Sequence, residues 1–160
     1  MSSGLRMAAA VVLASLAALA GYAFFITHEE TVRLPPVADC ALHLESCLAK
    51  LPPGGRIRLD IEPKNPSPSD LLRVVAKFEG LQPEAVGLRF KGIDMDMGYL
   101  EYFVHELGTT RSDESGSSFS GPAGVFACSM SLMRWQVWLQ IDLDGSRYEI
   151  PFAFETRQKG

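Results

Sequence analysis

The most constraining feature of the sequence is an apolar run near its N-terminus. Residues 7–26 contain no charged side chain and consist mostly of Ala, Leu and Val. At about 1.5 Å per residue, a helix of this length spans a hydrocarbon core about 30 Å thick. Arg6 precedes the run, whereas Glu29 and Glu30 follow it, and positive charge before a span favours a cytoplasmic N-terminus. We therefore expect a cytoplasmic tail at 1–6, a transmembrane anchor at 7–26 and an exported remainder.

A cleaved signal peptide is the competing interpretation of the same run. Residues 18–20 are Ala-Leu-Ala, the form that a signal peptidase accepts. However, the apolar residues continue to Ile26, so cleavage there would leave an apolar end. A lipoprotein would need a lipidated Cys where Tyr22 stands. We favour a retained anchor, and under either interpretation the rest of the chain is exported.

The exported part is acidic and long enough for one domain. Residues 27–39 include Pro35-Pro36 and predict a short, stiff linker, which leaves 40–160 as a single domain with an adequate core. All 19 acidic residues and 14 of the 15 basic residues follow the anchor, a formal charge of −5. Nucleic-acid binding requires a basic face, so we exclude that class of function.

Apolar and polar residues alternate along several short segments of this domain. Alternation with period two is typical of antiparallel strands that bury one face. The alternating runs lie at 57–61, 86–90, 135–143 and 148–154, and Asp144-Gly145 between the last two predicts a tight hairpin. About seven strands at such spacing predict an all-β domain, specifically an immunoglobulin-like antiparallel sandwich, preceded by one N-terminal transmembrane helix.

Two segments between these runs are less regular. Residues 71–79 fit either a strand or a helix capped at Ser69 or Asp70. We favour a strand because Val74, Val75 and Phe78 lie between turn signals. Residues 111–121 are polar and rich in Ser and Gly, and they predict a mobile loop.

Two cysteines lie close together at the start of the domain. Cys40 and Cys47 have six residues between them, and in an oxidising compartment this spacing predicts a local disulfide. Closing such a loop would stabilise the domain by about 2–3 kcal/mol. His43 lies between the two cysteines, so a Cys-His-Cys metal site is the alternative. If the pair is oxidised, Cys128 is a free thiol in an exported domain, which is unusual.

Soft sulfur donors gather in two short segments. Met95 and Met97 are two residues apart, so in an extended segment they project from the same face. Cys128, Met130 and Met133 form the second cluster. Each residue taken alone is more simply a core filler, but together they offer five soft donors, and thioether and thiolate donors select Cu(I). An antiparallel sandwich allows two such loops to meet at one end.

Catalytic motifs are absent from the sequence. There is no Gly-x-Ser-x-Gly, no Cys-x-x-Cys, no His-Glu-x-x-His and no glycine-rich phosphate loop. His105 belongs to an alternating run at 99–107, where we expect a sheet residue rather than a base. We therefore predict that the protein is not an enzyme.

Four motifs of the exported part form a pattern of their own. They are Asp39-Cys40 with Cys47, the Phe-Lys-Gly-Ile-Asp-Met-Asp-Met-Gly run at 90–98, Phe119-Ser120-Gly121, and Cys128 followed by Met133 and Trp135. On these motifs the chain resembles the small membrane-anchored periplasmic proteins of Gram-negative bacteria found with SCO-type copper chaperones and cytochrome oxidase assembly factors. More distantly, it is similar to the FixH/YtkA-like group, which is linked to oxidase biogenesis and copper-pump operons.

The resemblance implies copper delivery or oxidase assembly rather than catalysis. Met95, Met97, Cys128 and Met133 match its pattern, whereas Met130 falls in a variable position. We therefore expect a single-pass inner-membrane protein whose periplasmic domain binds Cu(I) through those four residues or assists assembly of a copper protein. An SCO-type chaperone or a cytochrome oxidase subunit is the implied partner. The alternative is a non-metal structural or interaction module of a membrane or respiratory assembly.

Overall fold

The computed structural model describes most of residues 30–160 and little of the N-terminal run. The described residues are 12, 15, 30–95, 98–106, 116–125 and 130–158. The chain divides into two compact units, Met1–Glu30 and Thr31–Gly160. Among the described residues, no helix is long and apolar enough to cross a membrane. Only Val12 and Ser15 of the predicted anchor are described, so the anchor stays a prediction.

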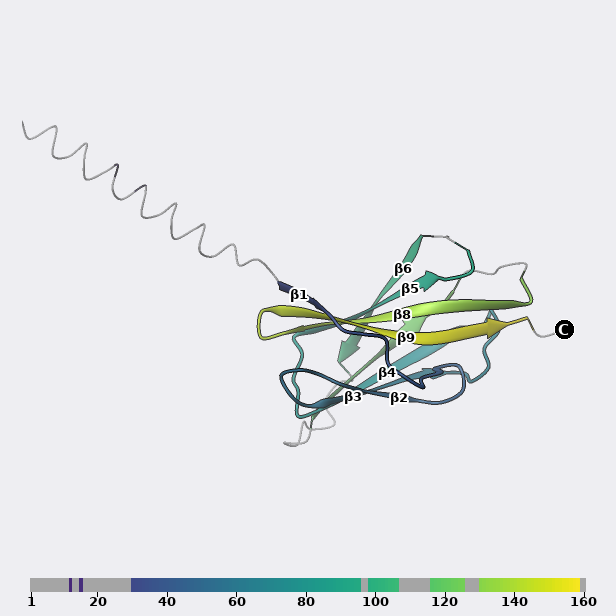
Figure 1. The fold of residues 1–160 in the computed structure, drawn as a ribbon, viewed down its shortest axis with the longest axis horizontal. Helices are drawn as coiled ribbons and strands as arrows, with labels where there is room; N and C mark the ends of the chain where they lie inside the picture. The colour runs from purple at the N-terminus through teal and green to yellow at the C-terminus, as the bar shows by residue number, and fades with distance from the viewer. Residues whose placement is uncertain are drawn as a thin grey trace, which may run out of the picture. The chain divides into compact units, whose positions relative to one another are not determined.

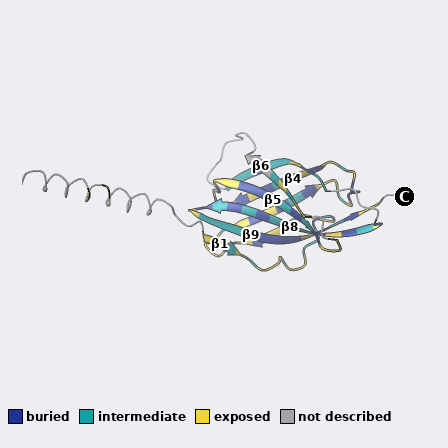
Figure 2. Ribbon diagram, turned by 90° about the horizontal axis from the view of Figure 1, so that it is seen from above, coloured by how far each residue is buried: buried dark blue, intermediate teal, exposed yellow. Residues whose placement is uncertain are grey.

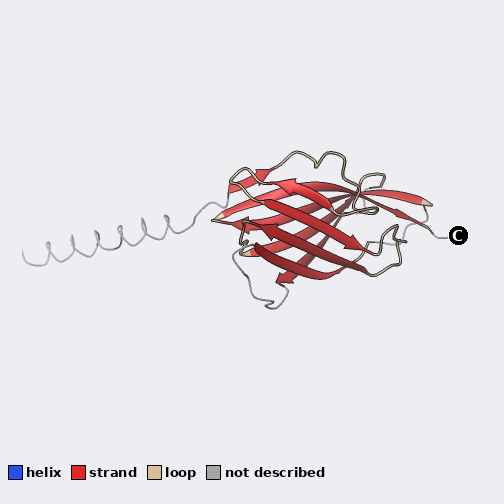
Figure 3. Cartoon of the chain, turned by 90° about the horizontal axis from the view of Figure 1, so that it is seen from below, coloured by secondary structure: helices blue, strands red, loops and turns tan. Residues whose placement is uncertain are grey.

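The described part of the second unit consists of strands joined by turns and loops (Figure 3). The nine strands among the described residues are β1 (Glu30–Arg33), β2 (Cys47–Lys50), β3 (Arg56–Glu62), β4 (Leu72–Glu79), β5 (Ala85–Gly92), β6 (Tyr99–Glu106), β7 (Gly116–Ala123), β8 (Leu132–Leu143) and β9 (Ser146–Arg157). The prediction of an all-β domain is confirmed. The number of strands exceeds the predicted seven, and β1, β2 and β7 are strands that no alternating run indicated.

The strands form two packed layers, so the domain is a β-sandwich. One layer contains β2, β3, β4 and β7, and the other contains β1, β9, β8 and β5. Strand β6 joins the layers, because its first part pairs with β5 and its last two residues pair with β7. Figure 1 shows the β8–β9 hairpin (green to yellow) in one layer and β2 to β4 (blue to teal) in the other. The order places β1 and β2 at the two edges.

Alternation along the strands decides which side chains form the core. Trp135, Val137 and Leu139 on the inner face of β8 are at most 1% exposed, and Figure 2 shows buried and exposed positions interspersed along the strands. The indole N–H of Trp135 donates to Oγ1 of Thr156 at 3.0 Å, which satisfies a buried polar pair. The predicted hairpin is also present, with positive φ at Asp144 and Gly145.

Two less regular segments are both strands. Residues 72–79 form β4, as predicted. The loop predicted at 111–121 is wrong for its second half, because Gly116–Ala123 is β7 and pairs with β4 along its whole length. Phe119 faces the core, and the small residues around it allow close approach to β4. Residues 111–115 lie outside the described part of the chain.

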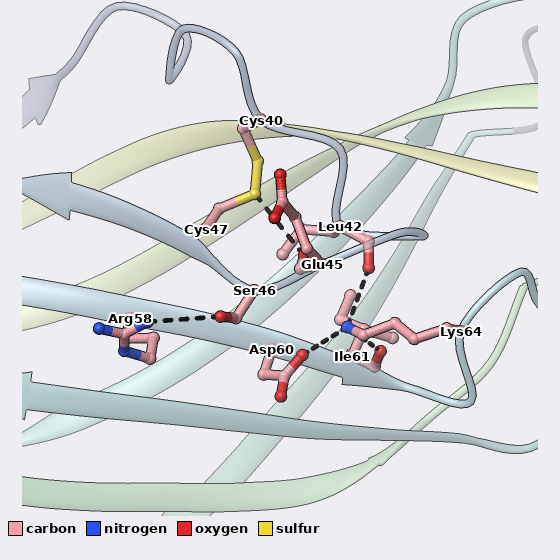
Figure 4. Close-up of a disulfide and its surroundings, with 9 residues drawn as sticks. All are labelled: Cys40, Leu42, Glu45, Ser46, Cys47, Arg58, Asp60, Ile61 and Lys64. Atoms are coloured by element: carbon pink, nitrogen blue, oxygen red, sulfur yellow. Dashed lines mark hydrogen bonds and ion pairs between the residues drawn. A yellow bond between two sulfur atoms is a disulfide. The ribbon is translucent and has the colours of Figure 1, made fainter.

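The predicted disulfide between Cys40 and Cys47 is present, with a Cα–Cα distance of 5.5 Å (Figure 4). Cys40 belongs to the segment that follows β1 along β9, whereas Cys47 begins β2. The intervening turn is anchored by the N–H of Leu42, which donates to the carbonyl of Ala153 at 3.0 Å. The carbonyl of Leu42 accepts a hydrogen bond from Nζ of Lys64 at 3.3 Å. The bridge therefore joins the two edges of the sandwich.

Candidate metal centre

A turn after β5 carries Met95, one of the predicted ligands, and is held against β8. The N–H of Ile93 donates to the carbonyl of Arg134 at 2.9 Å. Asp94 in turn accepts from the backbone N–H of Arg134 at 2.8 Å and from its Nε–H at 2.9 Å. These bonds, the side-chain one foremost, lower the pKa of Asp94. The turn at 92–95 is therefore fixed on the start of β8.

Gly92 allows this turn to lie directly on the core. A Cβ atom at position 92 would lie 2.5 Å from the carbonyl oxygen of Met95 and 2.6 Å from Cε of Met133. Both atoms therefore pack on the same side of Gly92. Because the sulfur of Met133 is bonded to that Cε, the turn and the Met133 thioether meet at one end of the sandwich.

The described sulfur residues differ in exposure. Met95 is 43% exposed and Met133 is 0% exposed. Met130 is partly buried and packs against the core. Met133 shares the inward face of β8 with Trp135, as the alternation predicts. The structure thus brings the backbone of Met95 close to the enclosed Met133 thioether, while Met97 and Cys128 lie outside the described residues.

His43, the alternative ligand, lies in the loop that the disulfide closes. Both neighbouring cysteines are oxidised, which removes the thiolates that a Cys-His-Cys site requires. The side chain of His43 is 13% exposed, and its Nε2 lies 3.6 Å from Oε2 of Glu155. Its Nδ1 is buried without a hydrogen-bond partner in the part of the chain that the structure describes. Within that same part, no three or more His, Cys, Asp or Glu residues form a group that could hold a metal ion.

The burial of His43 predicts a pH-dependent stability. Burial lowers the pKa of His43, although the carboxylate of Glu155 opposes the effect. The folded state therefore binds fewer protons than the unfolded state, and stability falls as the pH drops below the ordinary histidine value of about 6.5. Urea unfolding at pH 7.5 and 5.5 should show a larger loss of stability in the parent than in His43→Gln. Equal losses in the two proteins would contradict this assignment.

Sequence reasoning missed Arg134 as the residue that orients the Met95 turn. The motif alone indicates a solvated acid at Asp94, because nothing nearby in the sequence pairs with it. The contact depends on the register of β5 with β8, in which Gly92 lies opposite Trp135. The only local signals are an acid just after one alternating run and a base at the start of another.

Known proteins add no further constraint to this site. No protein-family model matches the chain, and no curated protein matches it either.

Proposed function

We propose that the chain is a membrane-anchored periplasmic protein that binds Cu(I) through Met95, Met97, Cys128 and Met133. Its role would be copper delivery to, or assembly of, a copper protein such as cytochrome oxidase, with an SCO-type chaperone or an oxidase subunit as partner. The protein would hold and transfer the ion without catalysing a reaction. Thioether and thiolate donors suit Cu(I), because soft ligands select it over hard cations.

The observation that carries the proposal is the contact of the Met95 turn with Met133. Two segments that are distant in the sequence converge at Gly92, through the Met95 carbonyl and the Met133 methyl. The double hydrogen bond from Arg134 to Asp94 holds that convergence in place. A preorganised turn with an accessible thioether is the kind of frame that a metal site requires.

The strand order supports the finer proposal of an immunoglobulin-like sandwich. In that fold, one sheet has the order A-B-E-D and the other contains C, F and G. If β3 to β9 are taken in chain order as A to G, β3-β4-β7 and β9-β8-β5 follow this arrangement. Strand β6, in the place of D, departs from it in part, because it pairs with β5 at six positions and with β7 at two. The two extra strands then flank A and G, and the candidate site lies at the end where C finishes and F begins.

Anaerobic competition with a chromogenic Cu(I) chelator tests the proposal on the full chain in detergent. We expect the parent to bind Cu(I) and both Met97→Leu and Cys128→Ser to weaken binding by about tenfold or more. Met130→Leu is the matched control and should bind like the parent, because it makes the same exchange at a position outside the ligand set. Parent-like binding by Met97→Leu and Cys128→Ser would show that the ligand assignment is wrong.

One observation favours the second candidate, an interaction module without a metal. Met133 is 0% exposed and belongs to the hydrophobic core, as a gap-filling methionine does. Met133→Leu separates the two functions, because this exchange conserves volume and removes only the sulfur. A ligand role predicts weaker Cu(I) binding with little change in stability, whereas an interaction module without a metal predicts that neither the parent nor the variant binds Cu(I).

A further inference from the structure

An apolar groove lies along the seam between the two edges of the sandwich. It is lined by residues 34–37 on one side and 48–52 on the other, together with Ile150 of β9, and encloses about 440 Å³. The disulfide at Cys40 and Cys47 ties these two sides together beside the groove (Figure 4). The groove contains no residue of the Met95 turn, so a ligand in the groove would bind independently of Cu(I).

The first side of the groove is unable to close onto β2. The N–H of Leu34 donates to the carbonyl of Glu149 at 2.9 Å, and that of Val37 donates to the carbonyl of Pro151 at 3.0 Å. Pro35 and Pro36 between them have no N–H. The segment therefore directs its donors to β9 and offers none to β2.

The second side of the groove is the free edge of β2. The N–H of Leu51 bonds to the carbonyl of Gly55 at 3.4 Å, and the register continues with Ala49 opposite Ile57. Hydrogen-bonded pairs alternate along an antiparallel ladder, so the backbone groups of Leu48 and Lys50 point away from β3. Within the described part of the chain, β2 has no neighbour on that side.

The outer face beside this edge is basic, although the whole chain has a net charge of −4. Leu48 lies opposite Arg58, which lies opposite Lys77 on the next strand. No carboxylate among the described residues forms an ion pair with Lys50, Arg58 or Lys77; the nearby Arg56 is paired with Glu79 at 2.8 Å. A second copy of β2 would bring like charges together, whereas an acidic strand would complement them.

We propose that the free edge of β2 binds an extended acidic segment of a partner protein by strand addition. The backbone groups of Leu48 and Lys50 would pair with the segment. Alternate apolar side chains of the segment would enter the groove on the face of Ala49 and Leu51, whereas Leu48, which is 43% exposed, lies on the outer face with Lys50. The intervening acidic side chains would face Lys50 and Arg58.

A fluorescein-labelled peptide, Ser-Val-Glu-Val-Asp-Val-Glu-Ser, tests this proposal with the full chain in detergent. We expect saturable binding by fluorescence anisotropy. A peptide N-methylated at alternate residues should bind at least about tenfold more weakly, because it keeps the side chains and loses the donors. A peptide with Lys in place of the acidic residues should lose binding to a similar extent.

Protein variants locate the site. Leu48→Pro and Leu48→Ala both remove the leucine side chain, but only Leu48→Pro also removes the N–H that faces the groove. The proline variant should therefore bind the acidic peptide about tenfold more weakly than the alanine variant. Lys50→Glu with Arg58→Glu should also weaken binding, whereas Arg157→Glu should not. Thermal unfolding of each variant checks that it folds, and the N-methylated peptide tests the same pairing on the unaltered protein.

Three results would overturn the proposal. They are failure of the parent to bind the acidic peptide, equal affinity for the acidic and N-methylated peptides, and a dimer of the full chain that Leu48→Pro dissociates in sedimentation. The last result would assign the edge to a second copy of the chain. Loss of Cu(I) binding with peptide binding intact would leave this site standing and remove only the copper proposal.

Discussion

Replacing Cys40 and Cys47 together by serine is expected to lower the free energy of unfolding by about 2–3 kcal/mol. The bridge closes a short loop in the unfolded chain and therefore limits its conformational entropy. In the folded state it also ties the first residue of β2 to the segment that runs along β9. For a domain of this size, the midpoint of thermal unfolding should fall by about 10 °C.

Urea unfolding of the fragment 30–160 measures the change, in a Cys128→Ser background that prevents formation of a new bridge. Ser46→Ala is the matched control, because it lies next to Cys47 and removes only a long hydrogen bond from Arg58. Its unfolding free energy should stay within about 0.5 kcal/mol of the parent. Thiol counting on the unreduced full chain should find one free cysteine. Three free thiols, or equal stabilities of the parent and the double serine variant, would contradict the prediction.

Alternation of apolar residues predicted most of the sandwich because burial on one face acts within a single strand. Each residue from Trp135 to Leu143 faces the side that its period-two position indicates. The turn at Asp144-Gly145 was predictable for a related reason, since its positive φ angles favour these residue types. Local rules of this kind require no knowledge of which strands are neighbours.

Pairing between distant strands could not be predicted in the same way. Strand β1 is four residues long, as is β2, and neither has enough alternation for a pattern to emerge. Strand β7 is rich in Ser and Gly, so only the neighbouring β4 reveals it as a strand. The candidate site depends on distant pairing as well, because Asp94 meets Arg134 only through the register of β5 with β8. The alternation and the motifs therefore indicated Met95 and Met133 but not the contact between the turn at 92–95 and the start of β8.

Gly116→Ala is expected to be the most destabilising single substitution that follows from this distant pairing. A Cβ at position 116 would lie 1.7 Å from the carbonyl oxygen of Phe78, a backbone atom of β4 that a side-chain rotation cannot move away. The φ angle of Gly116 is +145°, which also strains any residue with a Cβ. Backbone strain of about 1–3 kcal/mol and overpacking of about 1–3 kcal/mol together predict a loss of about 3 kcal/mol or more.

Gly54→Ala is the matched control, because it separates the steric clash from the backbone strain. Gly54 also has a positive φ of +110°, but a Cβ there would meet nothing within 4 Å. Its loss of stability should therefore reflect strain alone, about 1–3 kcal/mol. Urea unfolding of both variants in the fragment 30–160 measures the difference. A loop at 111–121, as the sequence predicts, would accept Ala at position 116 without a clash. Equal losses of unfolding free energy in the two variants would therefore mean that β7 does not pair closely with β4. A distinctly larger loss for Gly116→Ala would show that this polar strand is an integral part of the sheet.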